Sequence, residues 1–495
     1  MYRFRVYDPA GPDGSWSLQS AHLVGSDGRS APGIIRRDGA FIVCEPEGNR
    51  SIGLALLVSV GADERTVLQT CLLPARPEPY DLSIEIARWA IKQWLERCEA
   101  WQMWRPSLSA ASAEKWEDAR VCFRAALKCD DPVEAERLAR KSIAVGIDAA
   151  ESLTERHADF LLAQRFRRKG ASAATFGVCV DPALPPTVAS CAAAKLFDVI
   201  ALRTSWREIE PKAGKRDYSK LDAWMQWATN ERKFIVLGPI LDFSVRNGAP
   251  CELPAHVIAA LKKPKQFREL VHDHATDIAS RYPGVKLAIA SSGTNLPYWG
   301  GYGLDQIFDW MRVAITSLRT ANRSLNSMIE LQSIAGEEWK GATNFAWPVS
   351  FVQRIVSENL PIAAIGLRVV EGVGSDAVHD LLTLATVIDR FRGLEVRTLV
   401  SAFGMPSAGA TDRVGVRRAG WSDEVQRAWG GSMARVALGR PFIEAAWWSR
   451  LQDAAGGPHD GVLDVAGRAK PVLRELVELK RRVSVPLGGL EVDVV

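Results

Sequence analysis

The sequence predicts an α/β protein whose larger part is a (β/α)8 TIM barrel, preceded by a small β-sandwich-like domain and a long helical segment. After Gly170, eight apolar strand-like runs alternate with amphipathic helical stretches over roughly 310 residues, as eight βα units require. Turn-rich alternation fills residues 1–80, and a helical period fills residues 81–170. No G-x-G-x-x-G follows the first strand, which disfavours a doubly wound sheet.

The first 80 residues alternate short apolar runs with Gly, Pro and Asp turn signals, as in "GAFIVCEPEG" and "SIGLALLVSVGA". Such spacing favours a small antiparallel β-domain. A sandwich of this kind could bind sugar, but a packing role is the simpler interpretation. We therefore predict a β-sandwich-like domain over residues 1–80.

Residues 81–170 have the apolar period of helices. "DLSIEIARWAIKQWLERCEAWQMW" and "SAEKWEDARVCFRAALKC" are two amphipathic stretches, and a third begins at Asp131-Pro132, a good cap and first-turn pair. Four tryptophans recur at helical spacings, which favours a helix–helix core over a ligand-binding stripe; they are Trp89, Trp94, Trp101 and Trp104. The segment is also a candidate surface for a protein partner.

The barrel is predicted over residues 171–485, with the functional site on the loops that follow the strand C-termini. Its strands are predicted at 175–181, 199–206, 234–243, 286–295, 324–333, 362–372, 396–407 and 441–453.

The composition excludes several classes of protein. The net charge of +4 is spread without a long basic run, which argues against nucleic acid or an anionic membrane as the main partner. The start "MYRFRVYDPAGPDG" has no apolar signal region, and no run approaches the roughly 18 apolar residues of a membrane span. Eight cysteines without C-x-x-C pairs predict reduced thiols. A cytoplasmic protein without cofactor or metal is the expectation.

The segment "SWREIEPKAGKRDYSKLDAWMQWATNERKFIVLGPIL" contains the pattern W-x-x-I-E-P-x-x-G-x-x-[FY], from Trp206 to Tyr218 but with one residue more before the tyrosine. It resembles glycoside hydrolase family 10, the endo-β-1,4-xylanases. The closing "GVLDVAGRAKPVLRELVELKRR" is similar to the terminal phrase of many sugar-cleaving barrels. The resemblance covers about residues 173 to 483. It implies a TIM barrel with an oligo- or polysaccharide as partner.

The family's two catalytic glutamates are absent. The strand-four phrase W-N-E-P-N-L-P is similar to "SGTNLP", which places Gly293 at the proton donor. The strand-seven phrase is similar to "TLVSAFGMP", which places Ala402 at the nucleophile. Retaining glycosidases need both carboxyl groups. The resemblance therefore implies a carbohydrate-binding pseudoenzyme with respect to xylanase chemistry, and leaves open whether the chain is an enzyme.

Carboxylates elsewhere on the predicted rim are candidates for a relocated catalytic pair. Glu338 lies in "GEEW" after the fifth strand, and Glu371 ends the sixth. Trp339 beside Glu338 could stack a sugar and raise the pKa of that carboxyl group. Solvated rim residues, or ion pairs with Arg203 and Arg368, are the plainer interpretation.

Two arginines are predicted to point into the mouth, Arg203 and Arg368. Guanidinium groups suit carboxylate, sulfate or phosphate, so an acidic glycan is predicted; a structural ion pair with Glu371 or Asp242 is the alternative. Of the adjacent Trp447 and Trp448, only one can face the barrel, and Trp448 is predicted to do so. The predicted substrate-binding set is Arg203, Trp206, Asp242, Asn295, Trp299, Trp339, Arg368 and Trp448.

Three hypotheses remain open on the sequence. The first is a glycan-binding pseudoenzyme, the second an active glycosidase that uses relocated carboxylates such as Glu338 and Glu371, and the third a structural scaffold whose helical segment contacts a partner. The side chains that line the strand C-terminal face discriminate among them. Single histidines such as His379, interpreted as a surface or helix residue, have no metal-ligand spacing.

Overall fold

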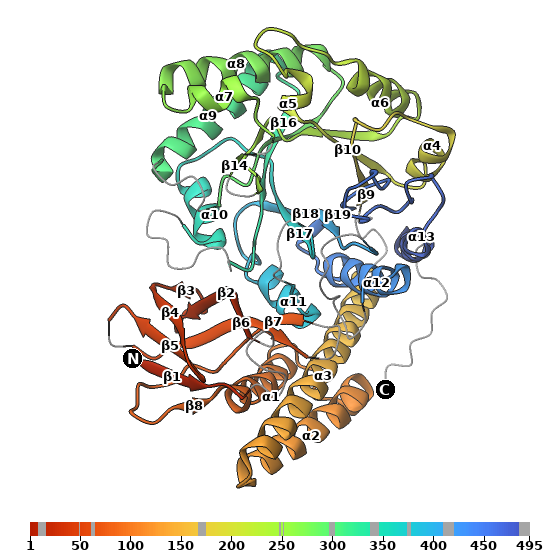
Figure 1. The fold of residues 1–495 in the computed structure, drawn as a ribbon. Helices are drawn as coiled ribbons and strands as arrows, with labels where there is room; N and C mark the ends of the chain where they lie inside the picture. The colour runs from red at the N-terminus through yellow and green to blue at the C-terminus, as the bar shows by residue number, and fades with distance from the viewer. Residues whose placement is uncertain are drawn as a thin grey trace.

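The chain forms two small sheets, three long helices and a closed barrel (Figure 1). The computed structural model describes residues 1–7, 16–48, 50–60, 65–166, 175–246, 249–250, 252–296, 302–336, 346–373, 378–408 and 420–484.

The N-terminal part contains two four-stranded sheets, ordered β4-β5-β1-β8 and β3-β2-β6-β7. Their strands are β1 (Tyr2–Arg5), β2 (Trp16–Val24), β3 (Ser30–Ala31), β4 (Gly33–Asp38), β5 (Phe41–Pro46), β6 (Gly53–Ser59), β7 (Arg65–Gln69) and β8 (Tyr80–Asp81). Phe4, Leu54 and Leu68 share one apolar core with Ile86 and Ile143, which lie on the helices that follow. The sheets therefore bury their inner faces against helices as well as against each other.

Three helices follow: α1 (Leu82–Ala100), α2 (Pro106–Lys128) and α3 (Pro132–Phe166). Trp89 and Trp94 are buried, and Trp101 stacks on His157, so these tryptophans form helix core as the spacing predicts. Trp104 differs, because 55% of its surface is exposed at the edge.

The long helix α3 joins the N-terminal part to the barrel. Ala158, Leu162 and Phe166, near its C-terminal end, belong to the large core that lies around the barrel strands. Arg165 donates hydrogen bonds of 2.8–3.0 Å to the backbone carbonyls of Leu438, Arg440 and Ile443. The division into residues 1–80, 81–170 and 171–485 stays a prediction.

Eight parallel strands close into the predicted barrel, and each lies within its predicted range. They are β9 (Thr175–Val180), β10 (Val199–Arg203), β11 (Phe234–Gly238), β15 (Leu287–Ser292), β16 (Asn326–Leu331), β17 (Ala364–Val370), β18 (Arg397–Gly404) and β19 (Ile443–Trp448). Pairing of β11 with β15 closes the ring, and the short β12 (Leu241–Asp242) extends it. A separate hairpin, β13 (Val245–Arg246) and β14 (Ala249–Pro250), follows.

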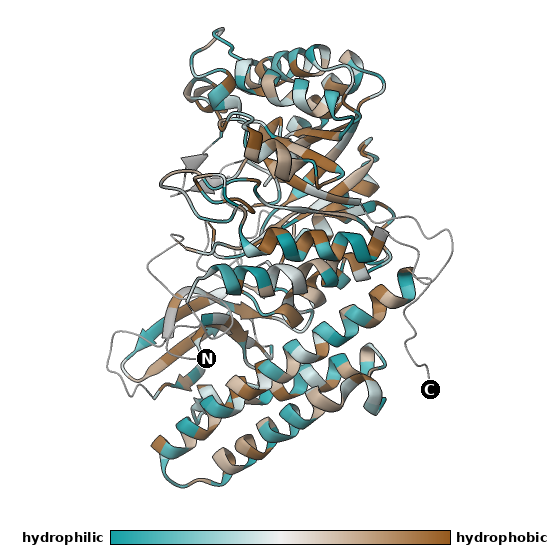
Figure 2. Cartoon of the chain, turned by 90° about the vertical axis from the view of Figure 1, so that its right-hand side faces the viewer, coloured by the Kyte–Doolittle hydropathy of each residue, from teal (hydrophilic) through white to brown (hydrophobic). Residues whose placement is uncertain are grey.

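Helices cover the outside of the barrel. They are α4 (Val188–Ala194), α5 (Trp206–Ile209), α6 (Ser219–Asn230), α7 (Ala255–Ala260), α8 (Pro264–Arg281), α9 (Leu304–Ala321), α10 (Pro348–Ser357), α11 (Leu381–Asp389), α12 (Asp423–Gly439) and α13 (Pro471–Ser484). Figure 2 shows mostly hydrophobic strands, and helices that carry hydrophilic residues as well. None of the helices in the described ranges is long and apolar enough to span a membrane.

The barrel interior is filled rather than hollow. Val199, Ala201, Ile289, Met328 and Trp447 form an apolar cluster inside the ring of strands, as in other barrels of eight strands. Toward the strand C-termini the inward side chains become polar, and this layer positions the candidate site.

The N-terminal sheet is attached to the rim of the barrel. The backbone N–H of Val67 on β7 and the hydroxyl of Thr66 both donate to the carbonyl of Val378, at 2.7 and 3.0 Å. Val378 lies between β17 and α11, on the side where the strands end. The edge of the mouth at β17 is therefore in contact with the N-terminal sheet that contains β7.

Candidate functional site

A buried ion pair lies at the centre of the polar layer. Arg203, the last residue of β10, donates two hydrogen bonds to Glu330 on β16, at 2.9 and 2.7 Å. Ser292 and Ser401 donate to the two oxygens of the same carboxylate, at 2.7 and 2.8 Å. Glu330 is fully buried. Such a charge is stable in an interior only with partners of this kind.

The ion pair fixes the protonation of its members. Burial alone would raise the pKa of Glu330, but the charge and hydrogen bonds of Arg203, the charge of Arg368 and the bond from Ser292 lower it to about 2. Burial would lower the pKa of Arg203, and Glu330 outweighs this so that the pKa rises. Glu330 therefore stays ionised near neutral pH and is not a proton donor.

This pKa predicts an acid-dependent loss of stability. The folded pKa of about 2 lies below the ordinary glutamate pKa of 4.5, so Glu330 contributes stability above about pH 4.5 that is lost as the pH falls toward 2. We expect the difference in free energy of unfolding between wild type and Glu330→Gln to shrink by about 3 kcal/mol across that window. Urea unfolding of both proteins at several pH values measures it.

Asp242→Asn is the matched control for this measurement. Burial raises the pKa of Asp242 by more than Arg203 and Ser244 lower it, so the sign is opposite. Its contribution to stability is present at low pH and is lost as the pH rises through the folded pKa. A Glu330→Gln difference that stays constant with pH would contradict the assignment.

A hydrogen-bonded chain connects the ion pair to Asp242. Gln332 donates from its amide to the hydroxyls of Ser292 and Ser244, at 2.7 and 2.8 Å. Ser244 in turn donates to Asp242 from both its backbone N–H and its hydroxyl. Asp242 thus contacts the ends of β15 and β16 through this chain. Its predicted place at the mouth agrees with these contacts, and its role with substrate stays a prediction.

Asn295 holds two strand ends together. Its side-chain amide donates to the carbonyl of Gln332 at 2.7 Å, and its side-chain oxygen accepts from the backbone N–H of the same residue at 3.0 Å. Asn295 has no exposed surface, so the prediction that it contacts substrate is wrong in this structure. The frame of the "SGTNLP" stretch is kept because it fixes the end of β15 to the end of β16.

The two positions of the missing glutamates do not suit a carboxylate. Gly293 has a φ of +70°, in the left-handed region, and a Cβ placed there would lie 3.1 Å from the carbonyl carbon of Phe243. Ala402 is fully buried in the apolar cluster inside the barrel. The left-handed backbone at position 293 therefore favours glycine, and the apolar surroundings of Ala402 disfavour a charged side chain.

Arg368 points into the mouth beside the ion pair. On β17 the alternate residues Ile365, Leu367 and Val369 point away from the barrel axis and pack in the core that surrounds the strands. Arg368 therefore lies on the inner face of the strand. Within the described part of the chain it makes no hydrogen bond or ion pair, although its charge lowers the pKa of Glu330. This guanidinium is therefore available to an anion.

Two predicted stacking residues lie in the core instead. Trp206 is 2% exposed, stacks on His274 with ring centroids 4.0 Å apart and donates to Glu210. Trp448 is fully buried, contacts Phe403 edge-on and donates to the backbone of Asp460. The prediction that Trp448 faces the mouth is wrong, because side-chain alternation turns Trp447 inward and Trp448 toward the helices. Trp206 begins the short helix α5 and is buried there.

Four further predicted residues divide into two groups. Glu371 is buried and accepts from the backbone N–H of His379 at 2.9 Å, with its ring nitrogen at 3.3 Å. The interpretation of His379 as a surface residue is wrong for this reason. Glu338, Trp339 and Trp299 lie outside the described residues.

A polar cavity of about 110 Å³ opens beside Arg203. It lies between the ends of β9 and β10, and its lining includes Pro182, Thr204, Glu208 and Lys220. Among the described residues, no group of His, Cys, Asp and Glu side chains is arranged to hold a metal ion.

Sequence reasoning missed Glu330 and Gln332, the two residues that organise the layer. The available signal was a charged residue inside the otherwise apolar run "MIEL". A charge at such a position is buried with a partner as a rule. The partner, 127 residues away, could not be read from the pattern.

Solved structures of xylanases are similar to this chain at low identity. Xylanase 10B from Thermotoga petrophila RKU-1 has a TM-score of 0.46 and 13% identity, covering 65% of this chain and 96% of that one. Xylanase 10B from Thermotoga maritima has a TM-score of 0.48 and 12% identity, covering 65% of this chain and 98% of that one. GH10 from Paenibacillus barcinonensis has a TM-score of 0.46 and 18% identity, covering 64% of this chain and 97% of that one. No family model and no curated protein matches the chain. The barrel assignment itself rests on the strand order of this chain.

Proposed function

We propose that the mouth of the barrel binds an acidic carbohydrate without cleaving xylan. The observation that carries the proposal is Arg368, an inward-facing guanidinium that forms no ion pair with any described residue. Arg203 is neutralised by Glu330, so charge selection falls to Arg368. A carboxylate or sulfate group on the sugar suits its planar fork of donors.

The motif resemblance supports a sugar as the rest of the ligand, and Gly293 and Ala402 support the absence of xylanase chemistry. Without an acid and a nucleophile at those places, only binding and general electrostatics would lower the barrier. Stacking by Trp299 and Trp339 is part of this proposal. A cytoplasmic location is also part of it, because eight cysteines occur without C-x-x-C pairs.

A titration of oligosaccharides tests the binding site. We expect uronic-acid or sulfated oligosaccharides to bind wild type more tightly than neutral ones, and Arg368→Gln to weaken the acidic ligand about tenfold or more. The affinity should fall as salt is added. Isothermal calorimetry against both ligand classes measures this.

Arg397→Gln is the matched control, since Arg397 begins the neighbouring strand β18 and its side chain is 71% exposed. Its affinity should equal that of wild type. If no glycan binds at millimolar concentration, or if Arg368→Gln leaves the acidic ligand unaffected, the proposal fails. A scaffold that contacts a protein partner through the helical segment then becomes the better function.

An active hydrolase on an acidic glycan is the second candidate. Asp242 favours it, because burial raises the pKa of this carboxyl group at the mouth and a proton donor needs such a shift. Glu338 and Glu371 remain the proposed relocated pair. Turnover of acidic oligosaccharides that is lost in Asp242→Asn or Glu371→Gln would favour this candidate over the pseudoenzyme.

A further inference from the structure

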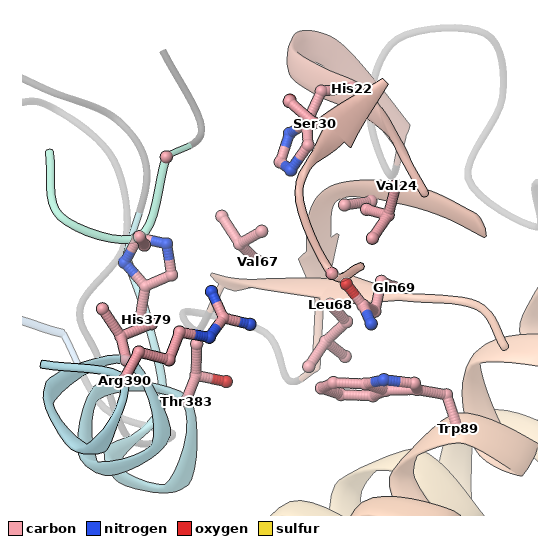
Figure 3. Close-up of a pocket in the computed structure, with 15 residues that line it drawn as sticks. His22, Val24, Ser30, Val67, Leu68, Gln69, Trp89, His379, Thr383 and Arg390 are labelled. Carbon is pink, nitrogen blue, oxygen red and sulfur yellow. The ribbon is translucent and has the colours of Figure 1, made fainter. Parts of the chain in front are cut away.

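A second cavity lies at the seam between the N-terminal sheet and the barrel. It has a volume of about 80 Å³ and is lined from both sides. Figure 3 shows Arg390 and Thr383, at α11, on one wall, with Gln69 of β7 and Trp89 of α1 on the other. The lining contains none of the residues that bind Glu330 in the polar layer, and His379 in its wall contacts Glu371 at the rim of the barrel.

Arg390 supplies a positive charge to this cavity. Its guanidinium lies 4.8 Å from the centre of the Trp347 ring, and it forms no hydrogen bond or ion pair with any residue of the described ranges. Burial lowers the pKa of Arg390, the charges of Arg97 and Arg29 lower it further, and the charge of Asp27 raises it in part. Arg29 is paired with Asp27 at 3.5 Å. An anion beside Arg390 would relieve the repulsion.

The neutral groups around Arg390 can donate hydrogen bonds. The indole N–H of Trp89 and the hydroxyl of Ser30 are both buried and have no partner within the described part of the chain. Trp89 is 8% exposed, and Figure 3 shows its nitrogen on the ring edge that faces Gln69. None of the residues that line the cavity is Asp or Glu. An indole N–H and a guanidinium are donors only, so the lining selects an acceptor.

We propose that this seam cavity binds a single oxyanion group, a carboxylate or a phosphate, with Arg390 as its charged anchor. The size is suitable, because the cavity of about 80 Å³ is smaller than the roughly 150 Å³ cavity that admits a benzene molecule, and so it holds a group of only a few heavy atoms. Trp89 and Ser30 supply neutral donors from the N-terminal part, and Arg390 supplies the charge from the barrel. A bound oxyanion therefore links the two parts.

Calorimetry and thermal unfolding of the full chain test the site, with inorganic phosphate and acetate as probes. We expect at least one probe to bind wild type at millimolar concentration and to raise the melting temperature, since it binds the folded state only. Arg390→Gln should weaken binding about tenfold or more. Trp89→Phe keeps an aromatic ring but removes the N–H together with the five-membered ring that carries it, so it should weaken binding about fivefold.

Two variants separate this site from other sources of charge. Arg392→Gln removes an exposed arginine close to Arg390 and should bind the probes as wild type does. Arg368→Gln alters the mouth of the barrel and should also leave the affinity unchanged. The inference is overturned if neither probe binds below about 10 mM, or if Arg390→Gln and Trp89→Phe both bind as tightly as wild type. If Arg392→Gln loses as much affinity for the probes as Arg390→Gln does, the attraction is nonspecific and the inference is overturned as well.

Discussion

Replacing Arg203 with methionine should lower the free energy of unfolding by about 3–5 kcal/mol. The substitution leaves Glu330, which has no exposed surface, as a buried carboxylate without its cation. Ser292 and Ser401 still donate to it, but two neutral hydrogen bonds do not replace a bidentate ion pair. Urea unfolding near neutral pH, followed by circular dichroism, measures the loss.

The exposed pair Arg397–Glu444 is the control for this experiment. Its N···O distance is 3.6 Å, and its side chains are mostly in solvent, so Arg397→Met should cost less than about 1 kcal/mol. The double variant Arg203→Met with Glu330→Leu should recover much of the loss, because apolar residues of similar volume often replace a buried pair without penalty. A loss below about 1 kcal/mol for Arg203→Met alone would mean that water reaches Glu330.

Restoring both family glutamates, as Gly293→Glu with Ala402→Glu, should yield no turnover of xylan or aryl β-xylosides and should destabilise the protein by about 5 kcal/mol. A side chain at the left-handed position of Gly293 costs about 1–2 kcal/mol, and the Cβ would lie 3.2 Å from the backbone nitrogen of Ser244. A glutamate at Ala402 would bury a charged group in the apolar cluster inside the barrel, at a cost of several kcal/mol.

Reducing-sugar assays and urea unfolding check this pair of outcomes, with heat-killed protein as the blank. Gly293→Ala is the control, since it carries the backbone strain without the charge and should cost about 1–2 kcal/mol. Wild-type cleavage of xylan well above the blank would disprove the mapping of Gly293 and Ala402. Vigorous cleavage by the double variant would disprove the steric argument.

The barrel could be predicted because its signal is local. Each βα unit can be recognised within a short stretch of sequence from an apolar run, a turn and an amphipathic helix. The right-handed closure of eight such units follows from their number. The helical segment with its tryptophans was predictable for the same reason. Trp104 is the exception, because the end of a helix can leave a ring beyond its neighbours.

The site was harder to predict because its contacts join distant parts of the chain. Arg203 ends the strand β10, but its partner Glu330 lies on a strand three positions away in the ring. Strand alternation also does not tell which side chains point inward when the pairing of the strands is irregular. The pairing of β18 with β19 is irregular between Val400 and Phe403. Trp448 was assigned to the wrong face of β19 for lack of such a reference.

The helix α3 makes it difficult for evolution to separate the N-terminal sheets from the barrel. Its C-terminal turns, with Leu162 and Phe166, complete the core around the barrel, while Ile143 and Ile147 nearer its start complete the core of the sheets. A recombination event that joined a foreign barrel to these sheets would need a helix α3 that packs correctly in both cores at once. We therefore expect the sheets, α3 and the barrel to have been inherited together, and to change in step with one another.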